Sequence, residues 1–182
     1  MPGHAAVVLP LPAFFELGAP AHWRAIDFMS DLHLCVSMPR TFEAWASHMA
    51  ATTADAVFIL GDLFAVWVGD DARHRSFERK CLEVLADATA HLQVAVMVGN
   101  RDFLLGAAML REGGAMGLPD ATVLTAWGQR MLLSHGDELC LDDLPYQAFR
   151  REVRSPQWQT AFLGRPLDER LQAAADMRRA SQ

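Results

Sequence analysis

The sequence predicts an α/β fold, because short apolar segments rich in β-branched and aromatic residues alternate with segments of helical periodicity. Four of the apolar segments are followed directly by Asp, His or Asn residues. Such strands are typical of a parallel or mixed sheet covered on both faces, and open sheets bind ligands at the carboxyl ends of their strands. Together, these observations indicate a polar site along one edge of a sheet.

The segment 56–60, with the sequence AVFIL, is the centre of this prediction. It is short and entirely apolar, so we expect a strand buried on both faces. Gly61 permits a sharp turn at its end and leaves Asp62 at the sheet edge. Three more strands are built in the same way: residues 25–29 precede Asp31 and His33, residues 93–98 precede Asn100 and Arg101, and residues 130–133 precede His135.

Helical segments and a change of pattern divide the chain into three expected parts. From residue 142 onward, strand-like segments stop and helical periodicity continues between prolines. We expect a loose N-terminal extension, an α/β core and a helical subdomain that docks on the sheet or covers a ligand as a lid: residues 1–22, 23–141 and 142–182. Helices within the core are expected at residues 39–50, 73–90 and 103–111, and a further strand at residues 122–124.

The composition is that of an ordinary folded protein, with 182 residues, 52% hydrophobic and 21% charged. The formal net charge of -6 argues against generic nucleic-acid affinity. Residues 1–146 carry 9 Lys and Arg against 18 Asp and Glu, whereas residues 147–182 carry 7 against 4. This basic excess fits a solvated helical surface or a patch for an anionic ligand equally well.

Cysteine spacing and hydropathy indicate the kind of cellular compartment in which the protein folds. Cys35, Cys81 and Cys140 show no C-x-x-C spacing, so we expect packed thiols in a reducing compartment rather than disulfides or a zinc knuckle. No run reaches the roughly 18 apolar residues needed to span a bilayer. Pro10 and Pro12 interrupt the apolar N-terminal segment, and no basic leading segment precedes it, so no secretory signal is expected.

Asp31, His33, Asp62, Asn100 and His135 together form a mixed set of oxygen and nitrogen donors. The set suits Mn²⁺, Fe²⁺ or Zn²⁺ better than a soft metal, because it contains no thiolate. Asp31 and His33 point to one side if the backbone stays extended, and Asp62 is the natural candidate to bridge two ions. Each motif alone is more often structural, so it is their recurrence after four apolar strands that indicates a metal site.

Other polar residues adjoin these motifs. Arg101 follows Asn100 and is suited to bind phosphate oxygens through two hydrogen bonds. The remaining acids are expected to be structural or to orient the ligand residues, namely Asp70, Asp71, Asp102 and Asp137.

The order of D-L-H, G-D, G-N-R-D and H-G-D resembles that of the calcineurin-like metallophosphoesterase superfamily. The stretches SDLHLC, ILGDLF, GNRDFLLG and HGDELC are similar to the UDP-2,3-diacylglucosamine hydrolases of lipid A biosynthesis, and the likeness runs from residue 28 to the end. This resemblance implies a β-sheet sandwich flanked by helices, with residues 142–182 as a lid that takes acyl chains. It also implies Mn²⁺-dependent, two-metal hydrolysis of a diphosphate bond, giving UMP and 2,3-diacylglucosamine 1-phosphate.

The resemblance further assigns roles to residues. It places Asp31 and His33 on a first Mn²⁺, Asn100 and His135 on a second, and Asp62 between them, with a metal-activated water as the only further catalytic group. Because the substrate is a lipid, it implies a cytoplasmic protein attached peripherally to the inner membrane, with no nucleic-acid partner. The substrate contacts that it implies are Asn100, Arg101, Asp143, Tyr146, Arg178 and Ser181.

Two departures from the family pattern bear on activity. Ala65 stands where the family usually has an acid after G-D-L-F. The late G-H-x-H motif, with one histidine for each metal, does not occur before Gln182. We therefore expect an incomplete second sheet and impaired activity of the 182-residue chain. A different metallophosphoesterase and a non-catalytic scaffold stay open as alternatives, although GNRDFLLG argues against the first and the five retained ligands against the second.

Overall fold

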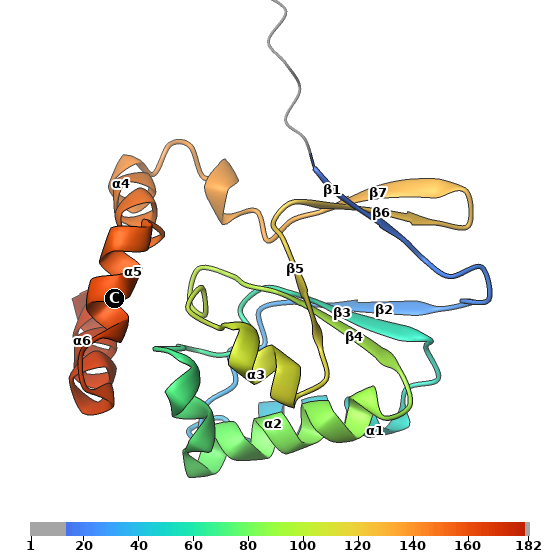
Figure 1. Cartoon of the computed structure of the whole chain (residues 1–182), viewed down its shortest axis with the longest axis horizontal. Coiled ribbons are helices and arrows are strands. Elements are labelled where there is room, and N and C mark those ends of the chain that lie inside the picture. The colour runs from blue at the N-terminus through green and yellow to red at the C-terminus, as the bar shows by residue number, and fades with distance from the viewer. Residues whose placement is uncertain (1–13, 181–182) are drawn as a thin grey trace, which may run out of the picture.

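The computed structural model describes residues 14–180, which form two β-sheets and two groups of helices (Figure 1). One sheet has four parallel strands in the order β2-β3-β4-β5. The other has the order β1-β6-β7, in which β1 is parallel and β7 antiparallel to β6. The predicted α/β class, with a parallel and a mixed sheet, is confirmed. The strands are β1 Phe15–Gly18, β2 Ile26–Met29, β3 Ala56–Leu60, β4 Gln93–Met97, β5 Met116–Leu118, β6 Thr122–Ala126 and β7 Gln129–Leu133.

Strand β3 lies inside the four-stranded sheet and is buried on both faces, as its apolar sequence predicts. Val57 and Ile59 belong to the core cluster shared with the helices, whereas Ala56 and Phe58 belong to the cluster between the two sheets. This division follows from the two-residue period of a strand. The Phe58 ring packs edge-on against Trp23 at a centroid distance of 6.3 Å, which ties the segment before β2 into the second cluster.

Helices α1 (Pro39–Ala51), α2 (Ser76–Thr89) and α3 (Ala107–Glu112) lie on the side of the four-stranded sheet away from the other sheet (Figure 1). The expected helix at residues 103–111 begins later, at Ala107. The cause is Asp70, whose carboxylate accepts hydrogen bonds from the backbone N–H groups of Gly106, Ala108 and Met109 at 2.8–3.0 Å. A carboxylate from a distant segment therefore fixes the first turn of α3.

The expected loose extension at residues 1–22 is partly wrong. Residues 1–13 lie outside the described part of the chain, but β1 follows them and pairs with β6 in the register Phe15↔Thr122 to Gly18↔Thr125. The backbone N–H of Ala19 continues this pairing to the Thr125 carbonyl at 2.8 Å. A four-residue strand that ends in a glycine has too short a pattern to be recognised. The same holds for the three residues of β5, which the sequence did not predict.

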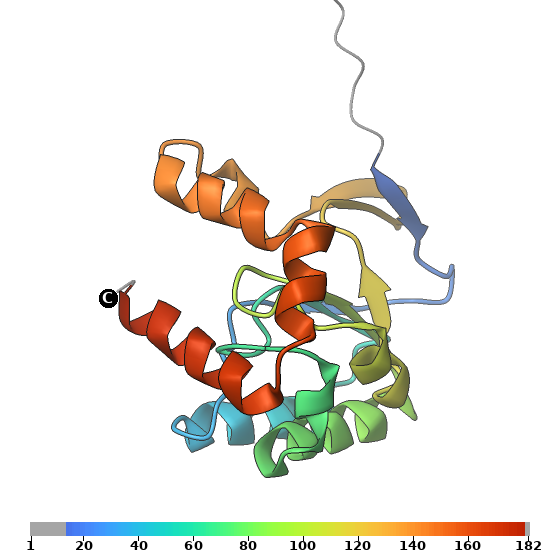
Figure 2. The same ribbon diagram turned by 60° about the vertical axis from the view of Figure 1, so that its left-hand side comes forward.

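Helices α4 (Leu144–Val153), α5 (Pro156–Leu163) and α6 (Leu167–Ala180) form a separate group at one end of the molecule (Figures 1 and 2). Phe162 and Ala174 of this group are buried in the core cluster that the sheet shares with α1 and α2. Trp158 stacks on Phe162 with ring centroids 4.6 Å apart, and its ring centroid is 6.1 Å from that of Phe103. The helical subdomain therefore docks on the body of the fold. Among residues 14–180, no helix combines the length and hydropathy needed to cross a membrane.

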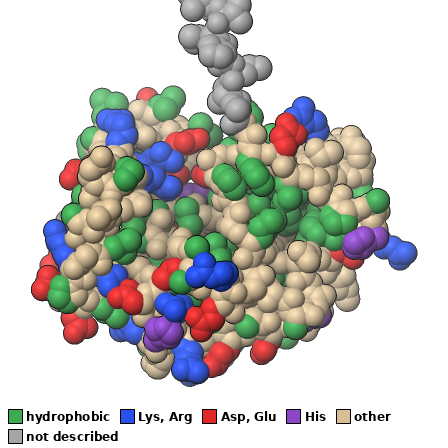
Figure 3. All heavy atoms as spheres, in the orientation of Figure 1, with side chains coloured by type: hydrophobic (Ala, Val, Ile, Leu, Met, Phe, Trp, Pro, Cys, Tyr) green, Lys and Arg blue, Asp and Glu red, His purple; other side chains and the backbone are tan. Residues whose placement is uncertain are grey.

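Arg170 is the main polar attachment of α6. Its side chain is only 3% exposed, donates to the Val68 carbonyl and pairs with the carboxylate of Asp71. Gly69 makes room for it, because a Cβ at this position would meet the guanidinium. Part of the basic excess of the C-terminal segment is thus matched by acids of the core, and basic and acidic side chains are interspersed over this side of the surface (Figure 3).

Replacing Asp71 by asparagine should test this attachment. The Asp71→Asn change leaves the buried Arg170 guanidinium without a carboxylate, so we expect the unfolding free energy at neutral pH to fall by about 2 kcal/mol. Urea denaturation measures it. The matched control is Asp87→Asn, because Asp87 is exposed on α2 and its side chain makes no hydrogen bond within residues 14–180; that change should stay within about 0.5 kcal/mol.

The same pair should make stability depend on pH. The hydrogen bond from Arg170 lowers the pKa of Asp71 below its ordinary value of 3.8, against the opposing effect of burial. A carboxyl group whose pKa is lowered by folding stabilises the protein above its unfolded pKa, and that stabilisation is lost as the pH falls through the folded pKa. The difference between wild type and Asp71→Asn should therefore shrink below pH 3.8. A difference that stays constant into acid would contradict this assignment.

Candidate metal centre

The carboxyl ends of β2, β3 and β4 lie side by side at one edge of the four-stranded sheet. Their register is parallel, with Met29 opposite Ile59 and Leu60 opposite Met97, so the segments that follow these strands leave the sheet together. The segment after β7 reaches the same place from the other sheet. All five sequence-predicted ligand residues are brought to this edge: Asp31, His33, Asp62, Asn100 and His135.

Asp31, His33 and Asp62 form a compact group in which one ligand atom of each residue lies within 4.8 Å of the others. The Nε2 atom of His33 is 3.0 Å from Asp62 Oδ2 and 3.8 Å from Asp31 Oδ1. Asp62 is 1% exposed, whereas Asp31 is exposed and His33 is intermediate. A buried carboxylate with an exposed carboxylate and an imidazole beside it can hold a divalent cation that enters from solvent.

The backbone of this group is strained in a way the sequence did not predict. Asp31, His33 and Asp62 all have left-handed conformations, with φ of 56°, 49° and 55°. The extended geometry assumed for Asp31 and His33 is therefore wrong, although their side chains still converge. Backbone hydrogen bonds hold the strained segments together: Asp31 N donates to Gly61 O at 3.1 Å, and His33 N donates to Asp62 O at 3.0 Å. Strain of this kind is concentrated at functional sites.

His135 and Asn100 form the second part of the site. The Nδ1 atom of His135 lies 3.0 Å from the carbonyl oxygen of Leu60, and a carbonyl only accepts, so Nδ1 is the donor. In the neutral ring, Nε2 then presents a lone pair toward Asn100 Oδ1, 3.0 Å away, and toward Asp62 Oδ1, 3.8 Å away. Three electron-rich atoms that face one another in this way fit a cation between them.

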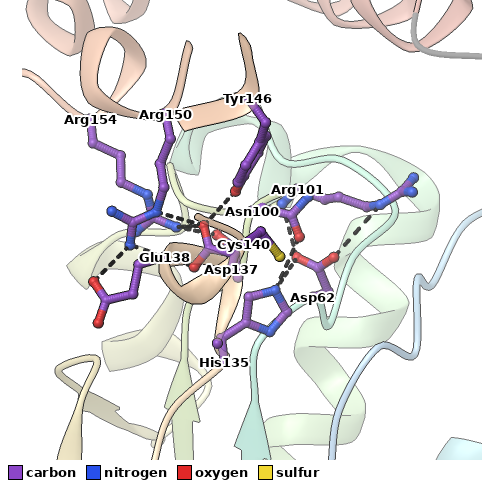
Figure 4. Close-up of polar contacts among 12 residues, drawn as sticks. Asp62, Asn100, Arg101, His135, Asp137, Glu138, Cys140, Tyr146, Arg150 and Arg154 are labelled. Atoms are coloured by element: carbon purple, nitrogen blue, oxygen red, sulfur yellow. Dashed lines mark hydrogen bonds and ion pairs between the residues drawn. The ribbon is translucent and has the colours of Figure 1, made fainter. Parts of the chain in front are cut away.

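Asp62 joins the two parts of the site. Its Oδ2 faces His33. Its Oδ1 faces His135 (Figure 4). The backbone N–H of Arg101 donates to Oδ1 at 2.8 Å and fixes the orientation of the carboxylate. The Nε atom of Arg101 is 3.6 Å from Oδ2, and the Arg101 side chain is 41% exposed. Asp62 thus lies between the two groups of donor atoms.

Two glycines allow these groups to approach. A Cβ on Gly61 would lie 2.2 Å from His135 Nδ1, and one on Gly99 would lie 2.1 Å from Asp62 Oδ1. Gly61 also has a φ of +93°. The glycines of G-D and G-N-R-D are therefore required by close packing around Asp62 and His135 as well as by the turn at the end of each strand.

Asp102 supports the loop that carries Asn100. Its side chain is fully buried and accepts hydrogen bonds from Gly99 N at 2.7 Å and Phe64 N at 3.3 Å. Burial raises the pKa of Asp102 to about 6, and the nearby charge of Asp62 acts in the same direction. The expectation that Asp102 is structural is consistent with these contacts: it fixes the loop that carries Asn100.

Helix α4 and its C-cap contribute two arginines that the sequence did not single out, Arg150 and Arg154, beside the predicted Tyr146. Arg150 donates to Asp137 Oδ2 at 2.8 Å, and the hydroxyl of Tyr146 donates to the same atom at 2.5 Å (Figure 4). Burial by itself raises the pKa of Asp137, but these two hydrogen bonds, together with the charges of Arg154 and Arg150, hold that pKa below its ordinary value. Arg154 donates to Asp137 and to the Gly99 carbonyl. In the sequence, these arginines look like ordinary surface residues of a helix.

A cavity of about 360 Å³ opens between the metal-ligand residues and α4. Asp143 and Tyr146, predicted to contact substrate, line it; Asp143 also caps α4 by accepting from Tyr146 N at 3.0 Å. Cys140 lines the cavity too and is exposed, so it is not the packed thiol we expected. Arg178 belongs to α6, but its side chain is outside the described structure, as is all of Ser181.

A larger cavity, of about 850 Å³, lies at the opposite ends of the strands. Trp23, Asp55 and His91 are among the residues that line it. Within residues 14–180, no group of three candidate metal ligands lies there. The chemistry of the donor atoms, rather than the volume of the cavity, therefore identifies the site.

Replacing Gly61 by alanine should destabilise the protein more than the strain of a positive φ alone explains. Gly128 is a matched control, because it also has a positive φ, of +74°, but has open space around its Cβ position. We expect Gly61→Ala to lower the unfolding free energy by about 2 kcal/mol more than Gly128→Ala, because of the collision with His135. Urea denaturation measures this, and the His135 ring resonances should shift only in Gly61→Ala. Equal effects of the two changes would show that the close approach is unimportant.

Known proteins are similar to this chain in sequence. The calcineurin-like phosphoesterase family matches residues 25–174. The UDP-2,3-diacylglucosamine hydrolase of Chromobacterium violaceum is 46% identical over 165 residues, which cover 87% of this chain and 67% of the relative. Those of Escherichia fergusonii and Escherichia coli are 43% identical over 157 residues, which cover 85% of this chain and 65% of each relative. The chain thus spans about two thirds of the length of these relatives.

Among solved structures, a protein of unknown function from Aquifex aeolicus superposes with a TM-score of 0.44 at 17% identity, over 70% of each chain. That likeness is too weak to support a functional statement. The family match and the identity to the curated relatives each cover most of the chain, and the family match includes every segment that supplies the donor atoms at the sheet edge. This chain belongs to the calcineurin-like phosphoesterase family.

Proposed function

We propose that the protein hydrolyses the diphosphate bond of UDP-2,3-diacylglucosamine, giving UMP and 2,3-diacylglucosamine 1-phosphate in lipid A biosynthesis. The single observation that carries the proposal is the convergence of Asp31, His33 and Asp62 with the Asn100–His135 pair at one sheet edge. The names of the similar proteins support the choice of substrate.

Two Mn²⁺ ions are the proposed cofactors. Asp31 and His33 would hold one ion, Asn100 and His135 the other, and Asp62 lies between them. The mixed oxygen and nitrogen donors support Mn²⁺ over a soft metal, because no thiolate belongs to the set. When bound, such ions supply an activated water and neutralise charge on the phosphoryl oxygens. The protein residues keep the donor atoms apart at fixed spacing and hold Asp62 buried.

Substrate phosphates are proposed to bind at Arg101 and Asn100. The Arg101 guanidinium is partly exposed beside Asp62, so it can form two hydrogen bonds to a phosphate without a large conformational change. The adjoining cavity of about 360 Å³ is at the small end of ligand sites and suits a polar head group. Asp143 and Tyr146 line it, and Arg178 and Ser181 complete the proposed set of substrate contacts.

The acyl chains are proposed to lie along the lid helices, with the protein attached peripherally to the inner membrane from the cytoplasm. Supporting this, Leu139, Leu141 and Leu144 are 70–72% exposed next to the cavity, where they can contact hydrocarbon. A lipid substrate has to be withdrawn from a bilayer, so an exposed apolar margin beside the site is useful. No interaction with nucleic acid is proposed, because the net charge is -6.

Calorimetric titration of Mn²⁺ into the wild-type chain and into Asp62→Ala tests the proposed site. We expect the wild type to bind Mn²⁺ and the variant to lose at least about 100-fold in affinity, because the shared carboxylate serves both parts of the site. Asp87→Asn, on the exposed face of α2, should bind like the wild type. Binding that survives in Asp62→Ala would place the metal elsewhere.

Substrate class is tested separately by the release of UMP from UDP-2,3-diacylglucosamine in the presence of Mn²⁺, compared with hydrolysis of a simple phosphodiester. We expect the wild-type chain to prefer the nucleotide lipid, and we expect Asp62→Ala to lose both reactions. A preference for the simple phosphodiester would contradict the proposed substrate while leaving the metal site intact.

A further inference from the structure

The ligand pair Asn100 and His135 is assembled from two different sheets. Asn100 follows β4 in the four-stranded sheet, and His135 follows β7 in the three-stranded sheet. Within residues 14–180, no backbone pairing joins these two strands. The two side chains nevertheless approach to 3.0 Å. The hydrogen bond from His135 to the Leu60 carbonyl joins the loop after β7 to the end of β3, and contacts outside both sheets add to it.

Arg154, the C-cap residue of α4, contacts both loops. Its Nη2 atom donates to the Gly99 carbonyl at 2.9 Å and to Asp137 Oδ2 at 3.3 Å. Gly99 directly precedes Asn100, and Asp137 lies two residues after His135. A single guanidinium from the lid helices thus connects the backbone of one ligand loop to a side chain of the other.

The position of this guanidinium is itself well defined. The side chain of Arg154 is 22% exposed, and its Cζ atom lies 5.8 Å from the centre of the Phe103 ring. On the other side of the contact, the N–H of Gly99 donates to Asp102 at 2.7 Å. Both backbone polar groups of Gly99 are therefore bound by side chains, one from the core and one from the lid. Such a residue transmits the position of α4 to the loop that follows β4.

We propose that Arg154 is a positioning residue that holds Asn100 and His135 at the spacing required to share a metal ion, so that docking of α4 and assembly of this ligand pair are coupled. The inference rests on the metal-binding part of the proposed function. Coupling between two sites is reciprocal, so a metal bound by Asn100 and His135 stabilises docked α4, and docked α4 raises the metal affinity.

Arg150 and Arg151 distinguish positioning from simple attachment of the helix. Arg150 also pairs with Asp137, at 2.8 Å, but it makes no hydrogen bond to Gly99. Arg151 is exposed, and its side chain makes no hydrogen bond or ion pair within the part of the chain that the structure describes. Arginine-to-glutamine changes at these positions and at Arg154 remove the same charge from one helical segment but break different contacts.

Amide hydrogen exchange, measured by NMR without metal, tests the coupling on the ligand loop itself. The reporters are the N–H groups of Gly99 and Arg101, which donate to Asp102 and Asp62. We expect at least about tenfold faster exchange in Arg154→Gln, because the loop loses its contact with α4. Arg150→Gln and Arg151→Gln should leave these two amides close to wild type.

Equal acceleration in Arg154→Gln and Arg150→Gln would overturn the inference, since it would assign both arginines to attachment of the helix alone. Unchanged exchange in Arg154→Gln would overturn it as well. Arg154→Lys keeps the charge and one donor, so it provides a second, better-folded variant. Its ammonium can reach Gly99 or Asp137 but lacks the planar fork, and an intermediate exchange rate is expected.

Mn²⁺ titration gives an independent readout. Changes that disturb the support of metal ligands typically weaken metal binding about 10–100-fold, so we expect a loss of this size in Arg154→Gln. Arg154→Lys should lose less affinity, and Arg151→Gln should bind Mn²⁺ like the wild type. Equal affinity of the wild type and Arg154→Gln would overturn only the inference about Arg154. A wild-type chain that binds no Mn²⁺ would overturn the proposed metal site and this inference together.

Discussion

Burial of the Asp62 carboxylate at the end of β3 is the constraint on which the rest of the site depends. Asp62 is 1% exposed, the Arg101 N–H donates to its Oδ1 at 2.8 Å, and His33 Nε2 lies 3.0 Å from its Oδ2. An ionised carboxylate in such a place is costly unless polar groups or a cation compensate. The strained backbone, the two glycines and the two histidines are all arranged around this one group.

The site is also held from the side of the lid. The core supplies Asp102 below the Gly99 backbone, and α4 supplies Arg154 above it. At the far end of the lid, Arg170 is buried against the loop that follows Asp62. The helical group is therefore attached at both ends to loops that begin at the metal-binding edge. This arrangement makes the lid part of the support of the site, with polar contacts that are specific in direction as well as in charge.

Much of the candidate site could be predicted from the sequence because its residues follow recognisable strands. The ends of strands β3 and β4 predict the positions of Asp62 and Asn100, because each residue follows its strand closely in the sequence. The support of the site could not be predicted in the same way. Arg154 and Asp137 are 17 residues apart, and Arg154 and Gly99 are 55 apart, so no local spacing relates them. In the sequence, Arg154 and Asp137 have the pattern of solvent-exposed charged residues, and only the docked helix brings them together.

The sequence by itself determined the fold class, the order of the buried strands along the chain and the polar side chains that follow them, because these depend on local periodicity and on the residues directly after each strand. Only the tertiary structure decided the left-handed backbone of Asp31, His33 and Asp62, and the tautomer that turns His135 Nε2 toward Asn100. It also decided that residues 15–18 form a strand. Each of these depends on hydrogen bonds between segments far apart in the chain, and a one-dimensional pattern does not encode such contacts.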